Sequence, residues 1–360
     1  MPAYKDAKKN TWYAKFQYKD WRGETKYITK RGFPTKREAV EFESNFKLHI
    51  AGNMDMTFEE FVKLYKEDRY PRIRPSTRFK KNHTIDTKLV PYFGKFKVTE
   101  IKTKDIVKWQ NELLEYRDPK TGKGYSKTYL KAIHNELNAI INYAVRYYDL
   151  KDNPVRKAGS IGISNAEEMN FWTLEEYLKF ADVMMDEPFF FYAFEVLYWC
   201  GLREGELLAL TFNDINFDDN TISVTKTYQI IKGEEIIGPP KTANGKRTVM
   251  MPDRLAAEMK DYFAMCFEKG NTRVFQTGKS QLHRAITRGA EKAGVKRIRI
   301  HDLRHSHISL LISLGFSPVD IAKRVGHESI TITLRYAHMF PNAQKKMTNA
   351  LNNLMNEEDS

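Results

Sequence analysis

The last third of the chain carries short polar clusters that read HDLRH at residues 301–305, VGH at residues 325–327 and RYAH at residues 335–338. A further cluster, GLREGE at residues 201–206, closes the apolar run that starts at Phe189. Each member is ambiguous when it is taken singly. Arg203 is either a salt-bridged structural residue or an anion ligand, and a lone tyrosine such as Tyr336 usually packs in a core or on a surface. The order and spacing of the whole set are therefore the informative signal.

Metal and nucleotide sites are the alternative interpretations of polar residues in this part of the chain. His301 and His305 lie four positions apart and share one face of a predicted helix, but no glutamate within the motif and no nearby cysteine completes a zinc site. Cys200 ends an apolar run and is expected to be a buried core thiol. Residues 278–280 resemble the end of a P-loop, but Arg273 stands where that motif needs glycine. We therefore expect neither a metal nor a cofactor.

Taken together, the clusters resemble the signature of the tyrosine recombinases, also called phage-type integrases: Arg203, a basic hairpin, His301, Arg304, Gly326, His327 and Tyr336. Val325 holds the aliphatic position before the Gly-His pair, where the family often has leucine. The resemblance covers nearly the whole chain, because the first two segments resemble the arm-binding and core-binding domains of lambda-type and conjugative-transposon integrases. It implies a multidomain α+β chain, mainly α with small β-sheets, ending in a mixed α/β catalytic domain of the tyrosine recombinase fold.

The resemblance implies a site that breaks and rejoins a DNA phosphodiester. Arg203 and Arg304 would hold the phosphate oxygens bidentately, because guanidinium groups keep their charge. His301 and His327 would donate hydrogen bonds to the same oxygens or move protons. Tyr336 would be the nucleophile, and its 3′-phosphotyrosyl link would conserve the bond energy for religation.

The leaving 5′ hydroxyl needs a general acid, which in the family is a lysine of the hairpin. Lys241, which a threonine follows ahead of a predicted strand, best matches that position. Lys246 and Lys226 compete with it. The sequence leaves this assignment open among the three lysines.

Two further polar residues are expected to position other site residues without contacting the substrate. Glu206, three residues after Arg203, is expected to orient a site residue such as His301, and His305 is expected to support its helix more than the chemistry. The catalytic set shows no departure from the family pattern, which disfavours a catalytically silent DNA-binding scaffold. A type IB topoisomerase-like enzyme is the other alternative, and the separate basic sheet domain and modest length disfavour it.

The charge distribution indicates a polyanionic partner. The 360 residues carry a formal net charge of +13, and the whole excess lies in residues 1–150. Lysine and arginine gain affinity for double-stranded DNA by releasing counterions from phosphates, so the first half is expected to bind DNA. A solubilising surface is the alternative. No apolar run is long enough to span a membrane and no signal peptide is visible, so we expect no membrane partner and a cytoplasmic protein. The resemblance implies that it acts in a bacterial host, in association with the nucleoid.

The pattern of periodicities predicts three domains and a linker. Residues 1–52 are expected to be an arm-type DNA-binding domain, residues 56–152 a helical, SAM-like core-binding domain, residues 153–169 a linker and residues 170–360 the catalytic domain. In the first domain, strands are predicted at residues 11–19 and 24–29, with a short third strand around residues 32–33. A helix follows from the N-cap Thr35.

Basic side chains of the first two domains are the candidate DNA contacts: Lys15 and Lys26 in the sheet, and Arg72, Arg74, Arg78, Lys80 and Lys81 among the helices. For the sheet domain, a generic protein-contact module is the alternative interpretation. The bases that such contacts read are not visible in a sequence.

The resemblance also implies partners. The active complex would be a homotetramer on core and arm attachment sites, exchanging strands through a Holliday junction to integrate and excise a prophage or mobile element. An excision or directionality factor and a host DNA-bending protein are expected to assist. A helix at residues 341–355, with Met347, Leu351 and Leu354 on one face, would dock on a neighbouring protomer or pack in cis.

Overall fold

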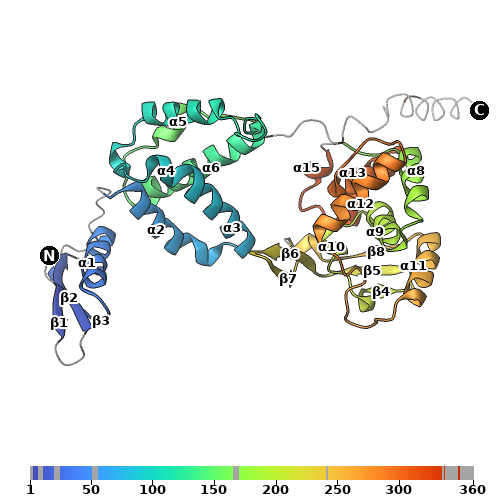
Figure 1. Cartoon of the computed structure of the whole chain (residues 1–360), viewed down its shortest axis with the longest axis horizontal. Coiled ribbons are helices and arrows are strands. Elements are labelled where there is room, and N and C mark those ends of the chain that lie inside the picture. The colour runs from blue at the N-terminus through green and yellow to red at the C-terminus, as the bar shows by residue number, and fades with distance from the viewer. Residues whose placement is uncertain are drawn as a thin grey trace, which may run out of the picture. The chain divides into compact units, whose positions relative to one another are not determined.

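The structure is a computed structural model, and it describes residues 3–6, 11–19, 25–50, 56–164, 170–240, 242–334, 336 and 348. The chain divides into two compact units, Met1–Ala166 and Glu167–Ser360, which are described one at a time. Lys241 and the apolar residues of the predicted C-terminal helix (Met347, Leu351 and Leu354) lie outside the described residues. The predicted fold class is confirmed, because the elements are mainly helices with small antiparallel sheets (Figure 1).

The first unit opens with a three-stranded antiparallel sheet and one helix. The elements are β1 (Ala3–Asp6), β2 (Thr11–Lys19), β3 (Thr25–Phe33) and α1 (Lys36–Ile50), and the strand order is β1-β2-β3. Phe16 of β2 is buried and packs on Phe42 and Phe46 of α1. The predicted N-cap is present, since the backbone N–H of Glu38 donates to Thr35 Oγ1 at 3.2 Å.

The positions of the strands differ from the prediction. Residues 24–29 and the segment around Gly32 belong to one strand, β3, and the third strand is the N-terminal segment Ala3–Asp6. Gly32 has a φ of 93°, and the pairing of β2 with β3 shifts register between Trp12 and Tyr13 opposite it. A glycine in this left-handed conformation carries the strand through a bulge. The segment that was predicted as a separate third strand is therefore the end of β3.

A helical domain follows in the first unit. Its elements are α2 (Phe58–Arg69), a 3₁₀ turn at Tyr70–Arg72, α3 (Pro75–Thr84), a π-helical turn at Ile85–Leu89, α4 (Val90–Phe93), a 3₁₀ turn at Val98–Glu100, α5 (Thr103–Glu115) and α6 (Lys127–Tyr147). A capping box starts α2, because the N–H of Thr57 donates to Glu60 Oε2 at 2.9 Å and the N–H of Glu60 donates to Thr57 Oγ1 at 3.3 Å. The helices bury one continuous apolar core that includes Phe61, Trp109 and Leu137.

The predicted linker, residues 153–169, begins with folded structure. Residues Pro154–Ala158 form α7, and Val155 is completely buried in the core of the helical domain. The side-chain amide of Gln110 on α5 donates to the carbonyl of Gly159 at 2.8 Å. The glycine and serine content suggested a linker, but the buried Val155 and this hydrogen bond fix the first part of the segment to the helical domain.

The second unit contains α8 (Leu174–Met184), α9 (Pro188–Cys200), α10 (Glu204–Leu207), α11 (Asp253–Met265), α12 (Lys279–Lys292), α13 (Ile300–Ser313), α14 (Pro318–Val325) and α15 (Ile330–Thr333). A three-stranded sheet joins β4 (Ile215–Asn216), β5 (Thr221–Val224) and β8 (Arg247–Met250), and β6 (Thr227–Ile231) pairs with β7 (Glu234–Gly238) in a separate hairpin. Two 3₁₀ turns lie at Phe212–Asp214 and Ala243–Gly245. No helix within the described ranges is long and apolar enough to cross a membrane.

Candidate active site

The end of α9 delivers the first arginine of the site. Gly201 caps the helix with a φ of 63°, and a Cβ there would lie 2.4 Å from the ring of His307. Only glycine fits a left-handed position with so close a neighbour. The sharp turn places Arg203 at the start of α10, where its side chain donates to Glu206 Oε1 at 2.7 Å and to the carbonyl of Gly326 at 2.9 Å.

Helix α13 supplies the second arginine. Arg304 is only 2% exposed, and its guanidinium donates to the carbonyl of Gly201 at 2.7 Å and to the carbonyl of Val325. These two carbonyls belong to the turns that carry Arg203 and His327. Arg304 therefore joins the end of α9 to the end of α14 and brings three predicted site residues together.

The end of α14 supplies a histidine by a second tight turn. Gly326 has a φ of 68°, and a Cβ there would lie 2.5 Å from the carbonyl oxygen of Asn244. The next residue, His327, is nearly buried, and its Nδ1 lies 2.8 Å from Thr333 Oγ1 on α15. This contact fixes the ring plane and leaves Nε2 as the nitrogen available to a substrate oxygen.

Tyr336 follows α15 and is only 2% exposed. It packs with Ile308 and Ile312 of α13 and with Val325 of α14. Its hydroxyl forms a hydrogen bond with Nδ1 of His305. The predicted nucleophile therefore lies against the helix that carries Arg304.

The partner of Glu206 differs from the prediction. Glu206 is 2% exposed and binds Arg203 at 2.7 Å and Arg247 at 2.9 Å, whereas the sequence suggested that it orients His301. Burial alone would raise the pKa of Glu206, but the hydrogen bond and charge of Arg247 and the charge of Arg203 lower it. A carboxylate with two guanidinium partners is satisfied by them, because charge-assisted hydrogen bonds are the strongest it can accept.

Arg247 is a site residue that the sequence did not single out. From β8 it donates to Glu206, to the carbonyl of Arg324 at 2.9 Å and to the carbonyl of Gly245 at 3.2 Å. Its side chain is 7% exposed. The only signal in the sequence was a basic residue in a predicted strand, at a position that alternation would have buried.

The site carries more positive than negative charge. The guanidinium groups of Arg203, Arg247 and Arg304 meet one carboxylate, Glu206, while the nearby Asp302 is taken up by Arg299 at 2.8 Å. Burial lowers the pKa of Arg304, as does the charge of Arg203. A guanidinium nevertheless stays charged in proteins. The arrangement therefore carries uncompensated positive charge, which the negative charge of a phosphodiester would neutralise.

Both predicted catalytic histidines are uncharged at neutral pH in the DNA-free chain. Burial and the charges of Arg304 and Arg203 lower the pKa of His327 to about 3. Although His301 is exposed, its partial burial, together with His305 and Arg304, lowers its pKa to about 4. A bound phosphate would raise both pKa values, because its charge offsets that of the arginines.

The lysines of the hairpin region separate into different surroundings. Lys226 is paired with Asp214 at 2.7 Å and donates to Thr211 at 3.1 Å. Lys246 is exposed and lines a hollow of about 410 Å³ together with His327. The contacts of Lys226 disfavour it as the general acid.

The sequence matches three family models. The model of the phage integrase family matches residues 173–343, that of the phage integrase N-terminal SAM-like domain residues 57–114, and that of the arm DNA-binding domain residues 2–50. Together they span most of the chain, and the first includes every predicted catalytic residue. The chain belongs to the phage integrase family. The predicted enzyme class, a site-specific tyrosine recombinase, is confirmed.

Curated relatives of this integrase-family chain align over most of their length. The ICEBs1 integrase of Bacillus subtilis is 27% identical over 342 residues, which cover 89% of this chain and 91% of the relative. A XerC-like tyrosine recombinase of Caldanaerobacter subterraneus is 25% identical and covers 89% of this chain and 90% of its own length.

Solved structures of integrases share the fold. The integrase of transposon Tn1549, bound to a circular intermediate DNA, superposes with a TM-score of 0.69 at 18% identity, over 83% of this chain and 99% of that one. A lambda integrase dimer bound to a COC′ core site gives a TM-score of 0.58 at 18% identity, over 93% of each chain. At this identity the likeness concerns the fold alone.

The candidate DNA contacts of the recombinase's helical domain fall into two groups. Arg72, Arg74 and Lys80 are exposed. Lys81 is paired with the nearly buried Glu136 at 2.5 Å, and Arg78 donates to the carbonyl of Ile73 at 2.6 Å. The pairing of Lys81 makes it a weaker candidate, because a phosphate would have to compete with a carboxylate that is already in place.

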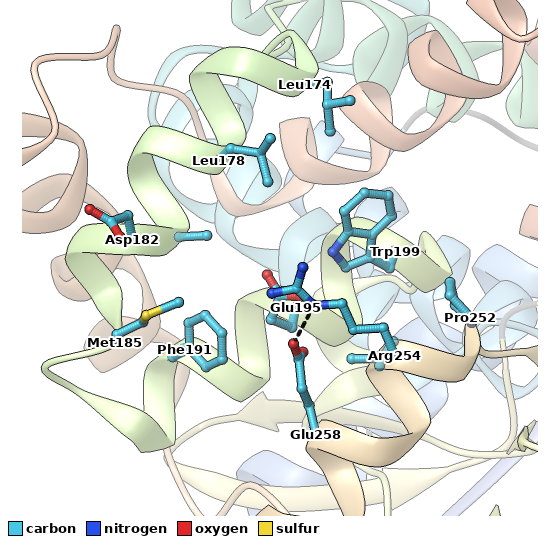
Figure 2. A pocket seen from close by; sticks show the side chains of 12 residues that line it. Leu174, Leu178, Asp182, Met185, Phe191, Glu195, Trp199, Pro252, Arg254 and Glu258 are labelled. Carbon is cyan, nitrogen blue, oxygen red and sulfur yellow. Dashed lines mark hydrogen bonds and ion pairs between the residues drawn. The ribbon is translucent and has the colours of Figure 1, made fainter.

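A second hollow of the recombinase, about 420 Å³, lies away from these catalytic candidates, between α8, α9 and α11 (Figure 2). Leu174, Leu178 and Trp199 give it an apolar wall, and Glu195 is buried at its side. Glu195 accepts a hydrogen bond from Tyr177 at 2.6 Å. Among the described residues, no group of three histidine, cysteine, aspartate or glutamate side chains is placed to hold a metal ion.

Glu195→Gln is expected to stabilise the recombinase at alkaline pH. Burial raises the pKa of Glu195 from 4.5 to about 7, so the folded state holds this proton more tightly than the unfolded state. The free energy of unfolding therefore falls as pH rises from about 4.5 to about 7, by on the order of 3 kcal/mol. Thermal melts at pH 8 should show a higher Tm for the variant, and melts at pH 5 little difference. A variant that is equally or less stable at pH 8 would show that Glu195 has an ordinary pKa.

Proposed function

We propose that this recombinase integrates and excises a prophage or other mobile element, with Arg203, Lys241, His301, Arg304, His327 and Tyr336 as its catalytic residues. The observation that carries the proposal is the cluster of three buried or half-buried guanidinium groups with one carboxylate, set against a helix that also contacts Tyr336. An excess of fixed positive charge stabilises the additional negative charge that a phosphodiester acquires in its transition state.

Strand cleavage would proceed by attack of the Tyr336 oxygen on a DNA phosphorus. The bond from phosphorus to the 5′ oxygen breaks, and the DNA is left attached to the enzyme through a 3′-phosphotyrosyl link. Arg203 and Arg304 hold the non-bridging oxygens, and His327 and His301 donate hydrogen bonds to them. The leaving 5′ oxygen takes a proton from Lys241. Attack by a 5′ hydroxyl of a second duplex reverses these steps and joins new partners through a Holliday junction.

The free face of the N-terminal sheet would bind arm sites. Residues directly opposite each other in an antiparallel pair point to the same side, so Lys15, which pairs with Thr29, lies on the face away from α1. Arg31 shares this face and lies 5.4 Å from the ring of Tyr13. Lys26 is opposite Tyr18 and lies on the α1 face instead. The two sheet lysines that the sequence suggested together therefore belong to different faces, and Arg31 joins Lys15.

Lys15→Ala is expected to weaken binding of the full-length chain to an arm-site duplex about three- to tenfold. If Lys15 contacts one phosphate, the slope of log affinity against log salt should fall by about one. Lys26→Ala is the matched control, since it removes the same charge from the opposite face. Fluorescence anisotropy at several salt concentrations measures both. Equal losses for the two variants would contradict a specific sheet face and indicate a diffuse charge effect.

The helical domain would bind the core site. Exposed Arg72, Arg74 and Lys80 are the candidate phosphate contacts. We further propose a homotetramer on paired sites, with residues 341–355 docking on a neighbour, and assistance from a directionality factor and a host DNA-bending protein. A lambda integrase tetramer bound to a Holliday junction is among the similar structures, at a TM-score of 0.54. The place of action would be the nucleoid in a bacterial cytoplasm.

Supercoiled plasmids test this function against its alternatives. One plasmid carries a pair of attachment sites from the ends of the element that encodes the chain, and a matched plasmid lacks them. We expect recombinant products from the first plasmid alone, with the predicted accessory proteins added. Relaxation of both plasmids without recombinants would favour a topoisomerase-like enzyme, and binding without either reaction would favour a silent scaffold.

A further inference from the structure

The Tyr336 hydroxyl contacts an imidazole that the sequence had placed in a supporting role. Nδ1 of His305 forms a hydrogen bond with this hydroxyl, and the centres of the two rings lie 5.8 Å apart. Tyr336 is 2% exposed and the side chain of His305 is 15% exposed. In the tautomer that carries its ring proton on Nε2, Nδ1 of His305 accepts the proton of the phenol, in a place with little water.

The other nitrogen of the same ring faces a fixed carboxylate. Nε2 of His305 lies 3.9 Å from Oδ1 of Asp302, which is 1% exposed. Arg299 holds that carboxylate by a bond of 2.8 Å from its guanidinium and by one of 2.8 Å from its backbone N–H. A carboxylate placed behind an imidazole favours the tautomer with the proton on Nε2 and stabilises the ring once it gains a second proton.

The two histidines of the predicted catalytic set are differently engaged. Nδ1 of His327 is bound to Thr333, and His327 lies in the turn after α14. The ring of His301 stands 4.9 Å from that of His305, edge to face, one helical turn earlier on α13. Of the three imidazoles, His305 is the one whose contact with the phenol is defined by a hydrogen bond.

We propose that His305 is the general base that takes the proton of Tyr336 when the tyrosine attacks DNA, with Asp302 positioning its ring. The inference rests on the proposed function. As the bond from the tyrosine oxygen to phosphorus forms, the phenolic proton moves to Nδ1 of His305. The 5′ oxygen leaves with the bonding electron pair and is protonated by the general acid. In religation the 5′ hydroxyl attacks phosphorus and returns its proton to the same general acid, now deprotonated. The phenolate leaves and takes back its proton from Nδ1 of His305.

A change in the acidity of the nucleophile separates proton transfer from structural support. The substrate is a nicked suicide duplex with the cognate core site, and the rate of covalent adduct formation is measured in single turnovers. His305→Gln keeps a hydrogen-bond acceptor for the hydroxyl but cannot take its proton. We expect cleavage to slow about a hundredfold while affinity for the duplex is unchanged.

Fluorinated tyrosine at position 336 alone lowers the pKa of the phenol. In His305→Gln, the cleavage rate at pH 7 should then recover by about tenfold for each unit by which that pKa falls, because the phenolate forms without a base. In the chain with His305, the same substitution should change the rate less than about threefold. Equal recovery in both backgrounds, or none in either, would overturn the proposal. If His305→Gln does not fold, the fluorinated chain that keeps His305 still tests the proposal. A cleavage rate that rises about tenfold there for each unit by which the phenol pKa falls would contradict a general base.

The pH profile supplies a second readout. The charged and titratable groups that face His305 are Asp302, Arg299, Arg304, His301 and Tyr336. Burial lowers the pKa of His305, so cleavage by the unmodified site should be level from about pH 7 upward. In His305→Gln, the rate should keep rising with pH as the phenol ionises, and a level profile there would overturn the proposal. Absence of any adduct from the unmodified chain on a bound cognate duplex would contradict the proposed function itself, whereas an adduct formed equally fast by His305→Gln would contradict only the role of His305.

Discussion

Arg304→Lys is expected to slow strand cleavage about a thousandfold, the magnitude typical of losing a donor to an oxyanion. The guanidinium of Arg304 spans two backbone carbonyls, those of Gly201 and Val325, from a position that is 2% exposed. A lysine keeps the charge but has one compact head group, so it cannot hold both turns and also present two parallel donors to a phosphate. The turns that carry Arg203 and His327 would then no longer be joined by hydrogen bonds to one side chain.

Single-turnover cleavage of a nicked duplex measures this loss, and DNA affinity is measured beside it. Arg254→Lys is the matched control, because Arg254 lies on α11, its side chain is 84% exposed and it pairs only with Glu258 among the described ion pairs. The control should cleave at the normal rate. Cleavage by Arg304→Lys within tenfold of normal would show that charge alone suffices at this position.

Glu206→Gln is expected to destabilise the catalytic domain by about 3 kcal/mol and to slow cleavage about a hundredfold. Glu206 is the shared carboxylate of Arg203 and Arg247, and the side chain of Arg247 is 7% exposed. Without the negative charge, two neighbouring guanidinium groups repel each other and one remains buried without its ion pair. Because the pKa of Glu206 is lowered in the fold, its stabilisation is present above the usual glutamate pKa and is lost as pH falls.

A second substitution distinguishes the two effects. In Glu206→Gln combined with Arg247→Gln, the buried unpaired charge is gone, so stability should partly return. Cleavage should stay slow, because Arg203 still lacks its carboxylate partner. Urea unfolding and the cleavage assay report the two quantities separately. Recovery of both together would mean that Glu206 acts only through stability.

A catalytic set could be proposed from the sequence because the chemistry restricts residue type at each position. Arginine, histidine and tyrosine are required whatever the surrounding fold, so order and spacing were enough to propose Arg203, His301, Arg304, His327 and Tyr336. The contacts between them were not predictable. Whether a carboxylate faces an imidazole or a guanidinium depends on side-chain directions across the fold, and Glu206 was therefore assigned the wrong partner.

The errors in the fold have similar causes. Residues 32–33 were predicted to form a separate short strand, but they continue β3 past a bulge that only the pairing with β2 reveals. Residues 154–158 were predicted as linker from composition, but they form α7, and Val155 is buried in the core of the helical domain. Lys15 and Lys26 were grouped by charge, and only the strand register assigns them to opposite faces. Long-range pairing decides all three features, and no local pattern encodes it.

The identity of the residue that becomes linked to DNA tests the account most directly. The chain is incubated with a nicked suicide duplex carrying its core site, the adduct is digested with protease and nuclease, and the modified peptide is sequenced by mass spectrometry. We expect a 3′-phosphotyrosyl bond at Tyr336, and no adduct from Tyr336→Phe despite unchanged binding. An adduct on another residue, or one that persists in Tyr336→Phe, would contradict the account.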